Sequence, residues 1–321
     1  MCGISESPKR MLHPILRIEH RKLSHCQTLW NRLFIHTPRS SPFVSFAWFD
    51  CLARFILHTD PEILLVYDRD TCVGIVPVHI ADGTVRFITD ERVTDVTGFV
   101  YLPRYADDIA RALASFTKQE GLRIELYPVE QNDPLVHRLA DCLSNAALTR
   151  ADVNPLLELP VSWNDYLATL TSKSRHELRR KLRKGHAVRL ETSAPNAIES
   201  LFELMAHDAR KRQFLTPEMR AFFAAITTHF FRNGWLRLRC ASIGNTLVAA
   251  LLTFSHHRCT YLYNMGINPQ YTPLSPGIVA IALDIESAII EGNRYYDFLR
   301  GDEEYKFRFG ARKQYTVSLQ A

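Results

Sequence analysis

The segment from Tyr261 to Gly292 constrains the fold of this chain more than any other part of its sequence. It begins with the run "YLYNMGIN", whose β-rich composition predicts a strand that ends near Gly266. A proline-containing loop follows, and "SPGIVAIALDIESAIIEG" then predicts a helix over 276–291, with Ser275 as its cap and Pro276 at the first helical position. The first turn of such a helix has free backbone N–H groups, which form a natural site for an anion.

The predicted elements follow a similar order in the two halves of the chain. The first half predicts helices over 24–33 and 43–58, strands between 62 and 89, a strand over about 95–102, a helix over 105–120, a strand over 122–129 and a helix over 134–145. The second half predicts helices over 163–170 and 174–184, a strand over 187–192, helices over 196–211 and 217–232, three strands between 235 and 268, the helix over 276–291 and a strand over 295–299.

Two segments also resemble each other in pattern. "YDRDTCVGIVPVHI" and "ASIGNTLVAALLTF" both place a polar turn before an apolar strand, so we interpret the chain as a duplicated α/β module. The segment 151–160, "ADVNPLLELP", is interpreted as a short extended connection between the halves. The predicted modules are therefore 1–154 and 155–321.

Composition agrees with two folded modules. The chain has 321 residues, 46% of them apolar, which is enough for two cores. Its seven cysteines are odd in number and scattered, with neither a C-x-x-C pair nor zinc spacing, so we expect reduced thiols, no metal site and a cytoplasmic protein. We also expect no signal peptide and no transmembrane helix.

Positive charge is concentrated in one segment. Residues 173–184 carry seven Lys or Arg against one acid, whereas the whole chain has 39 Lys and Arg against 34 Asp and Glu. A general nucleic-acid binder usually spreads its charge over a whole face, so this distribution argues against DNA as a partner.

The basic segment is predicted to be a short, well-delimited helix. Ser174 and Glu177 match a capping box, Gly185 stands where a helix ends, and Leu178 and Leu182 lie one turn apart and face inward. We interpret the outer residues as a basic wall beside a phosphorylated or acidic ligand, with a solvated helix face as the alternative. The candidate ligand contacts are Arg175, Arg179 and Arg183.

A second candidate site is "YYDFLRGDEEYKFRFG", residues 295–310. Strand alternation places Tyr295 and Asp297 on one face of the strand and Tyr296 on the other. Gly301 then ends the strand, so that the acidic and basic side chains after it can lie close together. Asp302 and Lys306 lie four residues apart, so one helical turn would bring them together as an ion pair. Such a cluster can orient a substrate or shift a pKa, although it can also be a surface turn that contributes little stability. Further candidate substrate contacts here are Asp297, Arg300 and Arg308.

The strand, loop and helix at 261–292 resemble the acyl-CoA site of GNAT-fold N-acyltransferases. Ile267, Pro269, Tyr271 and Gly277 fall in register with the pattern of that site, a hydrophobic-x-Pro-x-Tyr motif followed by a glycine-containing loop and a helix. The loop departs from the pattern, because its Arg or Gln and one of its glycines are missing and two positions are proline.

The basic helix, "YNMGINPQYTPLSPG" and "YDFLRGDEEYKFRFG" together resemble the CelD-type GNAT acyltransferases associated with bacterial cellulose and exopolysaccharide synthesis. The similarity covers 160–321 and extends more weakly over the first half. The segment 305–310, "YKFRFG", also resembles a motif of the Fem aminoacyl-tRNA-dependent ligases, which are built from two GNAT-like modules. The resemblance implies an α/β fold of two tandem GNAT-like modules, with mixed central sheets flanked by helices.

The same resemblance implies transfer of an acyl group from acyl-CoA to an amine or hydroxyl of a small-molecule or glycan-precursor acceptor, in polysaccharide or cell-envelope biosynthesis. The expected catalytic residues are Asp302, Lys306, Tyr263 and Tyr305. The expected donor-binding residues are Met265 and Gly266, whose amides would face the oxyanion, and Ser275, Pro276 and Gly277, whose helix turn would meet the phosphates.

Two alternatives remain open at this stage. An aminoacyl-tRNA donor would place RNA phosphates on the basic helix, and the altered loop also fits a catalytically inactive scaffold. The first module is expected to lack a donor site, because Asp107 and Asp108 at the predicted helix entry would repel a pyrophosphate.

Overall fold

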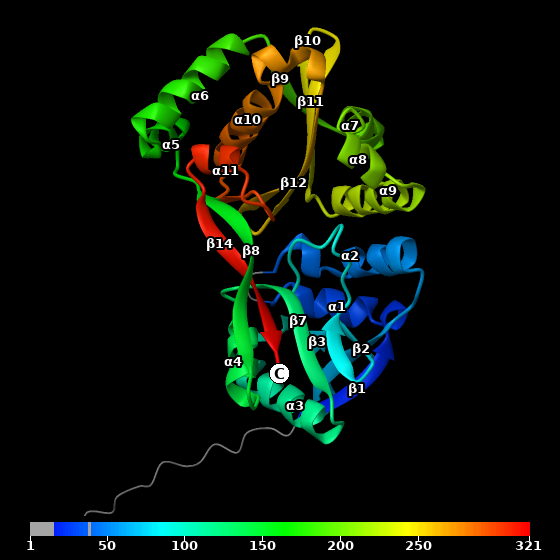
Figure 1. Cartoon of the computed structure of the whole chain (residues 1–321). Coiled ribbons are helices and arrows are strands. Elements are labelled where there is room, and N and C mark those ends of the chain that lie inside the picture. Colours follow the sequence, from blue (N-terminus) through cyan, green and yellow to red (C-terminus); the bar gives the residue numbers. More distant parts are fainter. Residues whose placement is uncertain (1–15, 38–39) are drawn as a thin grey trace, which may run out of the picture.

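The computed structural model describes residues 16–37 and 40–321 and has an α/β fold with mixed sheets flanked by helices, as the sequence predicts (Figure 1). In the first half the strands are β1 (Arg17–Lys22), β2 (Glu62–Asp68), β3 (Thr71–Val76), β4 (Val78–Ala81), β5 (Thr84–Phe87), β6 (Val100–Tyr101), β7 (Arg123–Glu130) and β8 (Ala147–Glu158). The helices are α1 (Gln27–Phe34), α2 (Phe46–Cys51), which continues as a π-helix over Leu52–Leu57, α3 (Ala106–Gln119) and α4 (Pro134–Cys142).

The second half carries the longer series of helices. They are α5 (Trp163–Thr169), α6 (Ser172–Lys184), α7 (Ile198–Met205), α8 (Ala209–Phe214), α9 (Pro217–Arg232), α10 (Pro276–Ile290) and α11 (Glu304–Arg308). The strands are β9 (Arg189–Ser193), β10 (Leu236–Ile243), β11 (Thr246–His256), β12 (Cys259–Ile267), β13 (Tyr295–Asp297) and β14 (Arg312–Gln320). Short 3-10 helices cover Leu23–His25, Pro42–Val44, Pro103–Tyr105, Pro195–Ala197 and Pro269–Leu274.

One sheet runs through both halves of the molecule. Its ten strands have the order β4-β5-β7-β14-β8-β13-β12-β11-β10-β9, and a second sheet has the order β1-β2-β3-β6. In Figure 1, β8 and β14 cross together from the part that contains α5, α6 and α11 to the part that contains α3 and α4. The C-terminal strand β14 lies between β7 and β8, to both of which it is antiparallel.

Three predicted elements are corrected by the structure, and one strand is added. The strand expected over 95–102 is reduced to Val100–Tyr101, and the connection expected at 151–160 is mostly part of β8. The helix expected over 196–211 is broken before Asp208, whose carboxylate accepts the backbone N–H groups that begin α8. Strand β14 was not predicted. The division into 1–154 and 155–321 stays a prediction, since the large sheet crosses it.

The two halves share a hydrophobic core. Phe43 and Trp48 from the first half lie 5.8 and 5.7 Å, between ring centroids, from Tyr263 of β12. Phe43 also meets Phe254 of β11 edge-on at 6.1 Å. Aromatic pairs at such distances stabilise beyond the area that they bury. The halves are therefore packed against each other and not merely linked.

None of the helices described over 16–37 and 40–321 is both long and apolar enough to cross a membrane.

Gly266 is required by the packing of β12 against α7. A Cβ atom built there would lie 2.6 Å from Cβ of Leu204 and 2.8 Å from the backbone nitrogen of Met205, so helix α7 would have to move. We expect Gly266→Ala to lower the free energy of unfolding by about 3 kcal/mol, as overpacking of a core does. Gly277→Ala is the matched control, because its nearest atoms are side-chain ends of Ile267 and Met265 at 3.1 Å. Thermal or denaturant unfolding measures both, and equal stability of the two variants would contradict the packing argument.

Candidate functional site

The strands β12 and β13 separate in the middle of the large sheet. They pair in parallel over three positions, the last of which joins Tyr261 to Asp297. Strand β12 continues to Ile267, whereas β13 ends and Leu299 adopts a φ of +54°. The ladder between β11 and β12 shifts register between Thr253 and Leu252, which leaves Tyr263 as a β-bulge. The result is an opening between two parallel strands, beside a bulge that bends β12.

Lys211 of α8, which no sequence pattern indicated as a site residue, reaches the open part of β12. Its ammonium donates to the carbonyl of Met265 at 2.5 Å and to Oδ1 of Asn264 at 3.4 Å. Burial lowers the pKa of Lys211, against the opposing influence of Asp208 and Glu303. The backbone N–H of Met265, an expected oxyanion donor, gives its hydrogen bond to Oδ1 of Asn264 at 2.9 Å. Only the break at Asp208, which turns α8 toward β12, could have pointed to this lysine.

The loop into α10 differs from its predicted form. Ser275 lies in the left-handed region, with a φ of +52°, at the end of the 3-10 helix Pro269–Leu274, and its side chain makes no cap hydrogen bond to α10. The prediction that the Ser275 side chain caps α10 is therefore wrong, because Ser275 also ends the 3-10 helix and takes its left-handed conformation there. Pro276 does take the first helical position and is buried, as is Gly277. A Cβ atom on Gly277 would lie 3.1 Å from Sδ of Met265, so the helix start packs closely on β12.

A cavity of about 610 Å³ lies between α6, the start of α10 and α11. We call it the helix cavity. It is lined by Lys173, Ser174, His176, Glu177, Leu178, Lys181, Ile278, Glu304, Tyr305, Arg308 and Phe309. Of the predicted site residues, Tyr305 and Arg308 line it, and burial raises the pKa of Tyr305. Its volume is in the range of small-molecule sites. Of its three Lys and Arg side chains, Lys181 and Arg308 pair with Glu177 and Glu304 of the same lining at 3.8 and 2.8 Å. A phosphate would therefore bind these cations in competition with the two carboxylates.

The basic helix has the predicted packing but a different start. Leu178 is buried and Leu182 packs on the same core, as expected. The capping box was wrong, because α6 begins two residues earlier and the Thr171 side chain accepts the N–H of Ser174. Glu177 instead pairs with Arg180 at 2.8 Å, and this hydrogen bonding lowers the pKa of Glu177 to about 2.

The cations of α6 that face the helix cavity differ from the predicted ones. Lys173 and Lys181 line it, whereas Arg175, Arg179 and Arg183 are not among its lining residues. The Arg175 side chain instead reaches the carbonyl of Leu167 at 3.4 Å. A ligand role for these three arginines stays a prediction, and it would use the outer face of α6.

The predicted ion pair between Asp302 and Lys306 is replaced by another. Lys306 is buried, its side chain only 3% exposed, and pairs with Glu303 at 2.9 Å. The ammonium also donates to the carbonyls of Leu299, Arg300 and Gly301 at 3.3, 2.8 and 3.2 Å. Asp302 is exposed. The short α11 turns Lys306 inward under the loop, so Lys306 fixes the segment that follows β13 and is not part of a surface pair.

Two other predicted residues connect the site to the first half. The Tyr263 hydroxyl donates to the carbonyl of Val93 at 2.7 Å. Arg300 pairs with Asp95 at 3.1 Å and donates to the carbonyl of Glu91 at 2.6 Å. Burial raises the pKa of Asp95 to about 6, although Arg300 opposes this shift. Both side chains therefore hold the strand opening against the segment 90–97.

Asp297 faces a second cavity, of about 350 Å³, which we call the interface cavity because both halves line it. Burial raises the pKa of Asp297 to about 7, while the backbone N–H of Leu299, 2.7 Å from its Oδ1, lowers it. Tyr261, the partner of Asp297 in the last pair of β12 and β13, lines the same cavity. The interface cavity thus lies at the point where the strands begin to separate.

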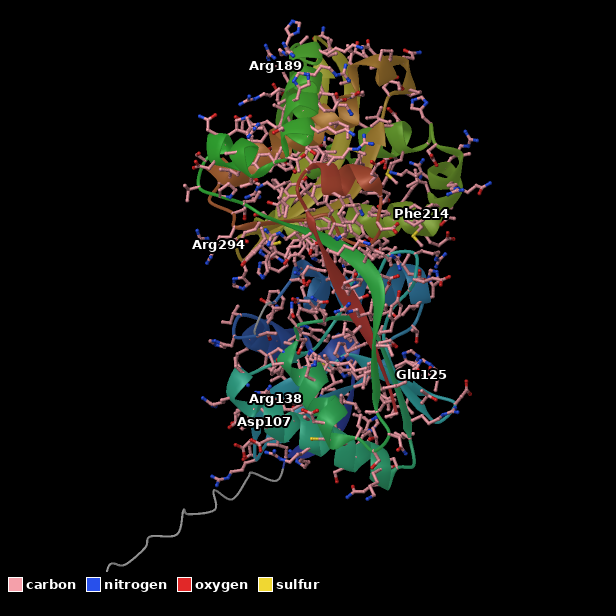
Figure 2. The ribbon with its side chains drawn as sticks, turned by 60° about the vertical axis from the view of Figure 1, so that its left-hand side comes forward. Asp107, Glu125, Arg138, Arg189, Phe214 and Arg294 are labelled. Atoms are coloured by element: carbon pink, nitrogen blue, oxygen red, sulfur yellow. The ribbon has the colours of Figure 1, made fainter. Side chains whose placement is uncertain are left out.

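Helix α3 of the first half begins with acidic residues, whereas α10 of the second half has none in its first turn. Asp107 and Asp108 occupy the first turn of α3, as predicted. Asp107 pairs with Arg138 of α4 at 2.5 Å, and Figure 2 shows the two side by side, far from Arg189 of β9. The expectation that the first module has no donor site of its own is consistent with this charge and stays a prediction.

Comparison with known proteins identifies the type of fold. Residues 172–307 match the family model described as "Acetyltransferase (GNAT) domain". No curated protein sequence matches the chain.

Several solved structures are similar to almost the whole chain. The crystal structure of FemX is 11% identical, covers 95% of this chain and 96% of its own, and has a TM-score of 0.66. A conserved protein of unknown function from Bacteroides thetaiotaomicron is 14% identical, covers 95% and 99%, and has a TM-score of 0.64. A tandem GNAT protein from the clavulanic acid biosynthesis pathway is 10% identical, covers 95% and 98%, and has a TM-score of 0.51. The GNAT-like α/β fold that the sequence predicts is thereby confirmed.

Proposed function

We propose that the protein is a GNAT-type acyltransferase that moves an acyl group from acyl-CoA to an amine or hydroxyl acceptor, in the polysaccharide or cell-envelope biosynthesis that the CelD-type resemblance implies. The observation that carries the proposal is the separation of β12 and β13 beside the bulge at Tyr263. An extended pantetheine arm fits such an opening in the way that an added strand fits a sheet edge.

The helix cavity supports the proposal as the place for the charged end of the donor. It lies at the start of α10, with Lys173, Lys181 and Arg308 on its walls. Free N–H groups at the first turn of α10 and nearby cations both favour phosphate groups. The donor would extend from this cavity toward the strand opening.

Chain residues would then position the reacting groups. Transfer requires the acceptor to attack the thioester carbon directly, so placement of both substrates supplies a large part of the rate. Lys306 would hold the loop that follows β13, and Lys211, with its lowered pKa, adjoins the carbonyl of Met265 at the opening. Oxyanion stabilisation by the amides of Met265 and Gly266 would require Met265 to exchange its hydrogen bond to Asn264.

A tRNA-linked donor is the second candidate, because the outer face of α6 carries further arginines. This face is separate from the helix cavity and includes Arg179 and Arg183. A polyanion such as RNA would be recognised there through its phosphates, with a strong dependence on salt.

Two triple variants with the same loss of charge distinguish the donors. We expect Lys173→Gln, Lys181→Gln and Arg308→Gln together to weaken acetyl-CoA binding by about tenfold or more, because charge-assisted contacts to phosphate are lost. The salt dependence of binding should also become flatter. Arg179→Gln, Arg180→Gln and Arg183→Gln form the comparison triple on the outer face, and should leave acetyl-CoA affinity close to that of the parent.

Isothermal titration of both triples and the parent with CoA, acetyl-CoA and bulk tRNA measures the outcome. If the parent binds tRNA but not acetyl-CoA, and the outer-face triple variant loses tRNA binding, the tRNA-linked donor is favoured. A parent that binds none of the three ligands would support the inactive scaffold and contradict the proposed function.

A further inference from the structure

The interface cavity is lined mostly by polar side chains, which come from both halves of the chain. It is lined by Ser40, Ser41, Val96, Glu130, Gln131, Asn132, Asn154, Leu156, His257, Cys259, Tyr261, Tyr295, Asp297, Gln314, Tyr315 and Thr316. The carboxylates in this lining are Glu130 of β7 and Asp297 of β13, which come from the two halves of the chain. Neither Lys nor Arg is among the lining residues that the structure describes.

Asn154 gives independent evidence that a ligand belongs there. The residue is 7% exposed, and its Oδ1 has no hydrogen-bond partner among the described residues. A buried amide oxygen without a donor is unfavourable by about 1–3 kcal/mol, so buried polar groups are usually paired. Asn154 lies on β8, opposite Gln314 of β14, and both line the cavity. A ligand that donates a hydrogen bond would satisfy this oxygen.

The remaining lining suits a small molecule with several hydroxyl groups. The amides of Gln131 and Gln314 hydrogen-bond to each other, and the Thr316 hydroxyl accepts the backbone N–H of Asp152. Each of these groups has further donors or acceptors, as have the amide of Asn132 and the hydroxyls of the serines. Three tyrosine rings add flat apolar surfaces, which also attract a cation. The volume of about 350 Å³ is at the small end of ligand sites.

We propose that the interface cavity binds the acceptor as a primary ammonium on a small polyhydroxylated molecule, of the amino-sugar type, with Asp297 holding the ammonium group and Asn154 accepting a hydrogen bond from the ligand. The proposal rests on the acyl-transfer function proposed above and narrows its acceptor from an amine or hydroxyl to an amine. The amine would lie beside the strand opening, because Tyr261 and Asp297 form the last pair of β12 and β13 and both line the cavity.

The chemistry of the transfer is balanced without a further reactant. One ammonium proton passes to the Asp297 carboxylate and from there to solvent, and this leaves a neutral amine that can attack. The nitrogen forms a bond to the thioester carbon while the carbon–sulfur bond breaks. The leaving thiolate takes the second proton from the nitrogen, and the products are the amide, free CoA thiol and one proton in solution.

Amine binding should depend on pH in a direction that follows from the surroundings of Asp297. Burial raises its pKa to about 7, with Glu130 of β7 and Asp95 adding to the shift, and Lys306 of α11 and the N–H of Leu299 opposing it. His257 and Tyr261 line the same cavity. Since the carboxylate becomes ionised as the pH rises through about 7, we expect affinity for an ammonium to increase between pH 6 and pH 8.

Matched pairs of ligands test the proposal on the full chain. We would titrate D-glucosamine against D-glucose, and glucamine (1-amino-1-deoxy-D-sorbitol) against D-sorbitol, because the two members of each pair differ chiefly in one amine for one hydroxyl. We expect the amine to bind about tenfold or more tightly in at least one pair, and glucamine to bind more tightly at pH 8 than at pH 6. Equal affinity within both pairs, or binding of neither amine, would overturn the proposal.

Variants assign the preference to the cavity. Asp297→Asn keeps an oxygen for the N–H of Leu299, and should abolish the amine preference and its pH dependence while acetyl-CoA affinity is unchanged. Glu130→Gln, on the opposite wall, is the second variant if Asp297→Asn does not fold, and should reduce the preference. Glu158→Gln is the control, an exposed acid of β8 that is not among the cavity residues. An amine preference that survives both cavity variants would contradict the assignment.

Acetyl-CoA titration separates this proposal from the proposed function. If the parent does not bind acetyl-CoA but shows an amine selectivity that Asp297→Asn abolishes, the amine site is supported and acetyl-CoA is contradicted as the donor. If the parent binds acetyl-CoA but shows no amine selectivity, the proposed donor is supported and the proposed amine site is contradicted.

Discussion

Removal of residues 312–321 is expected to abolish cooperative folding of the whole chain. Strand β14 lies between β7 and β8 inside the ten-stranded sheet, so its loss would leave one edge of each of these long strands unpaired. Leu319 and Val317 of β14 are buried in the core of the first half with α3 and α4. Circular dichroism and size-exclusion chromatography of residues 1–311 would then show loss of structure or aggregation, as unpaired strand edges favour.

A single substitution tests the same strand with less disruption. Leu319 is fully buried, so Leu319→Asp should lower the free energy of unfolding by about 4 kcal/mol or prevent folding, because it removes apolar packing and buries a carboxyl group. Gln320→Asp is the matched control, since Gln320 is the next residue of β14 and is exposed. Denaturant unfolding compares the two. A stable 1–311 chain, or equal effects of both substitutions, would show that β14 is dispensable.

This strand also marks what the sequence could not predict. Helices such as α3, α6, α9 and α10 follow from local periodicity and end signals, and the structure places them within a few residues of their predicted bounds. The partners of β14 depend on pairing across more than 150 residues, which no local pattern encodes. For the same reason β8 could be mistaken for a connection, because an extended segment shows its role only when its neighbours are known.

In the site, too, the residues that lie close together in the sequence could be predicted, and those that come from distant segments could not. The strand, loop and helix at 261–292 were found because they are contiguous, and the alternation that puts Asp297 and Tyr296 on opposite sides is local too. Glu130, Asn154 and Lys211 reach the two strands from elsewhere in the chain, so they could not be placed beside them. Spacing alone paired Lys306 with Asp302, whereas burial turns it toward Glu303 and the carbonyls of the loop.

Lys306→Met is expected to reduce both stability and turnover, which revises what spacing alone predicts. The ammonium is buried and holds the carbonyls of Leu299, Arg300 and Gly301, which methionine cannot do. Glu303 is 58% exposed and can turn to water, so the main cost is the buried carbonyls left without a donor. We expect a loss of about 3 kcal/mol in the free energy of unfolding. Thermal and denaturant unfolding measure it.

The effect on turnover should exceed the effect on folding at permissive temperature, because the loop that Lys306 holds follows β13 directly at the strand opening. Misplacement of reacting groups by about 1 Å can cost about 10²-fold in rate, and we expect a loss of that order in acetyl transfer at a temperature where the variant is folded. Lys306→Gln, which keeps two donors, should recover part of both losses. Asp302→Asn is the comparison in the same loop: Asp302 is exposed, so its stability should match the parent's, and loss of turnover there alone would assign it a catalytic role. Full stability and full activity in Lys306→Met would show that its carbonyl contacts position neither the loop nor the substrates.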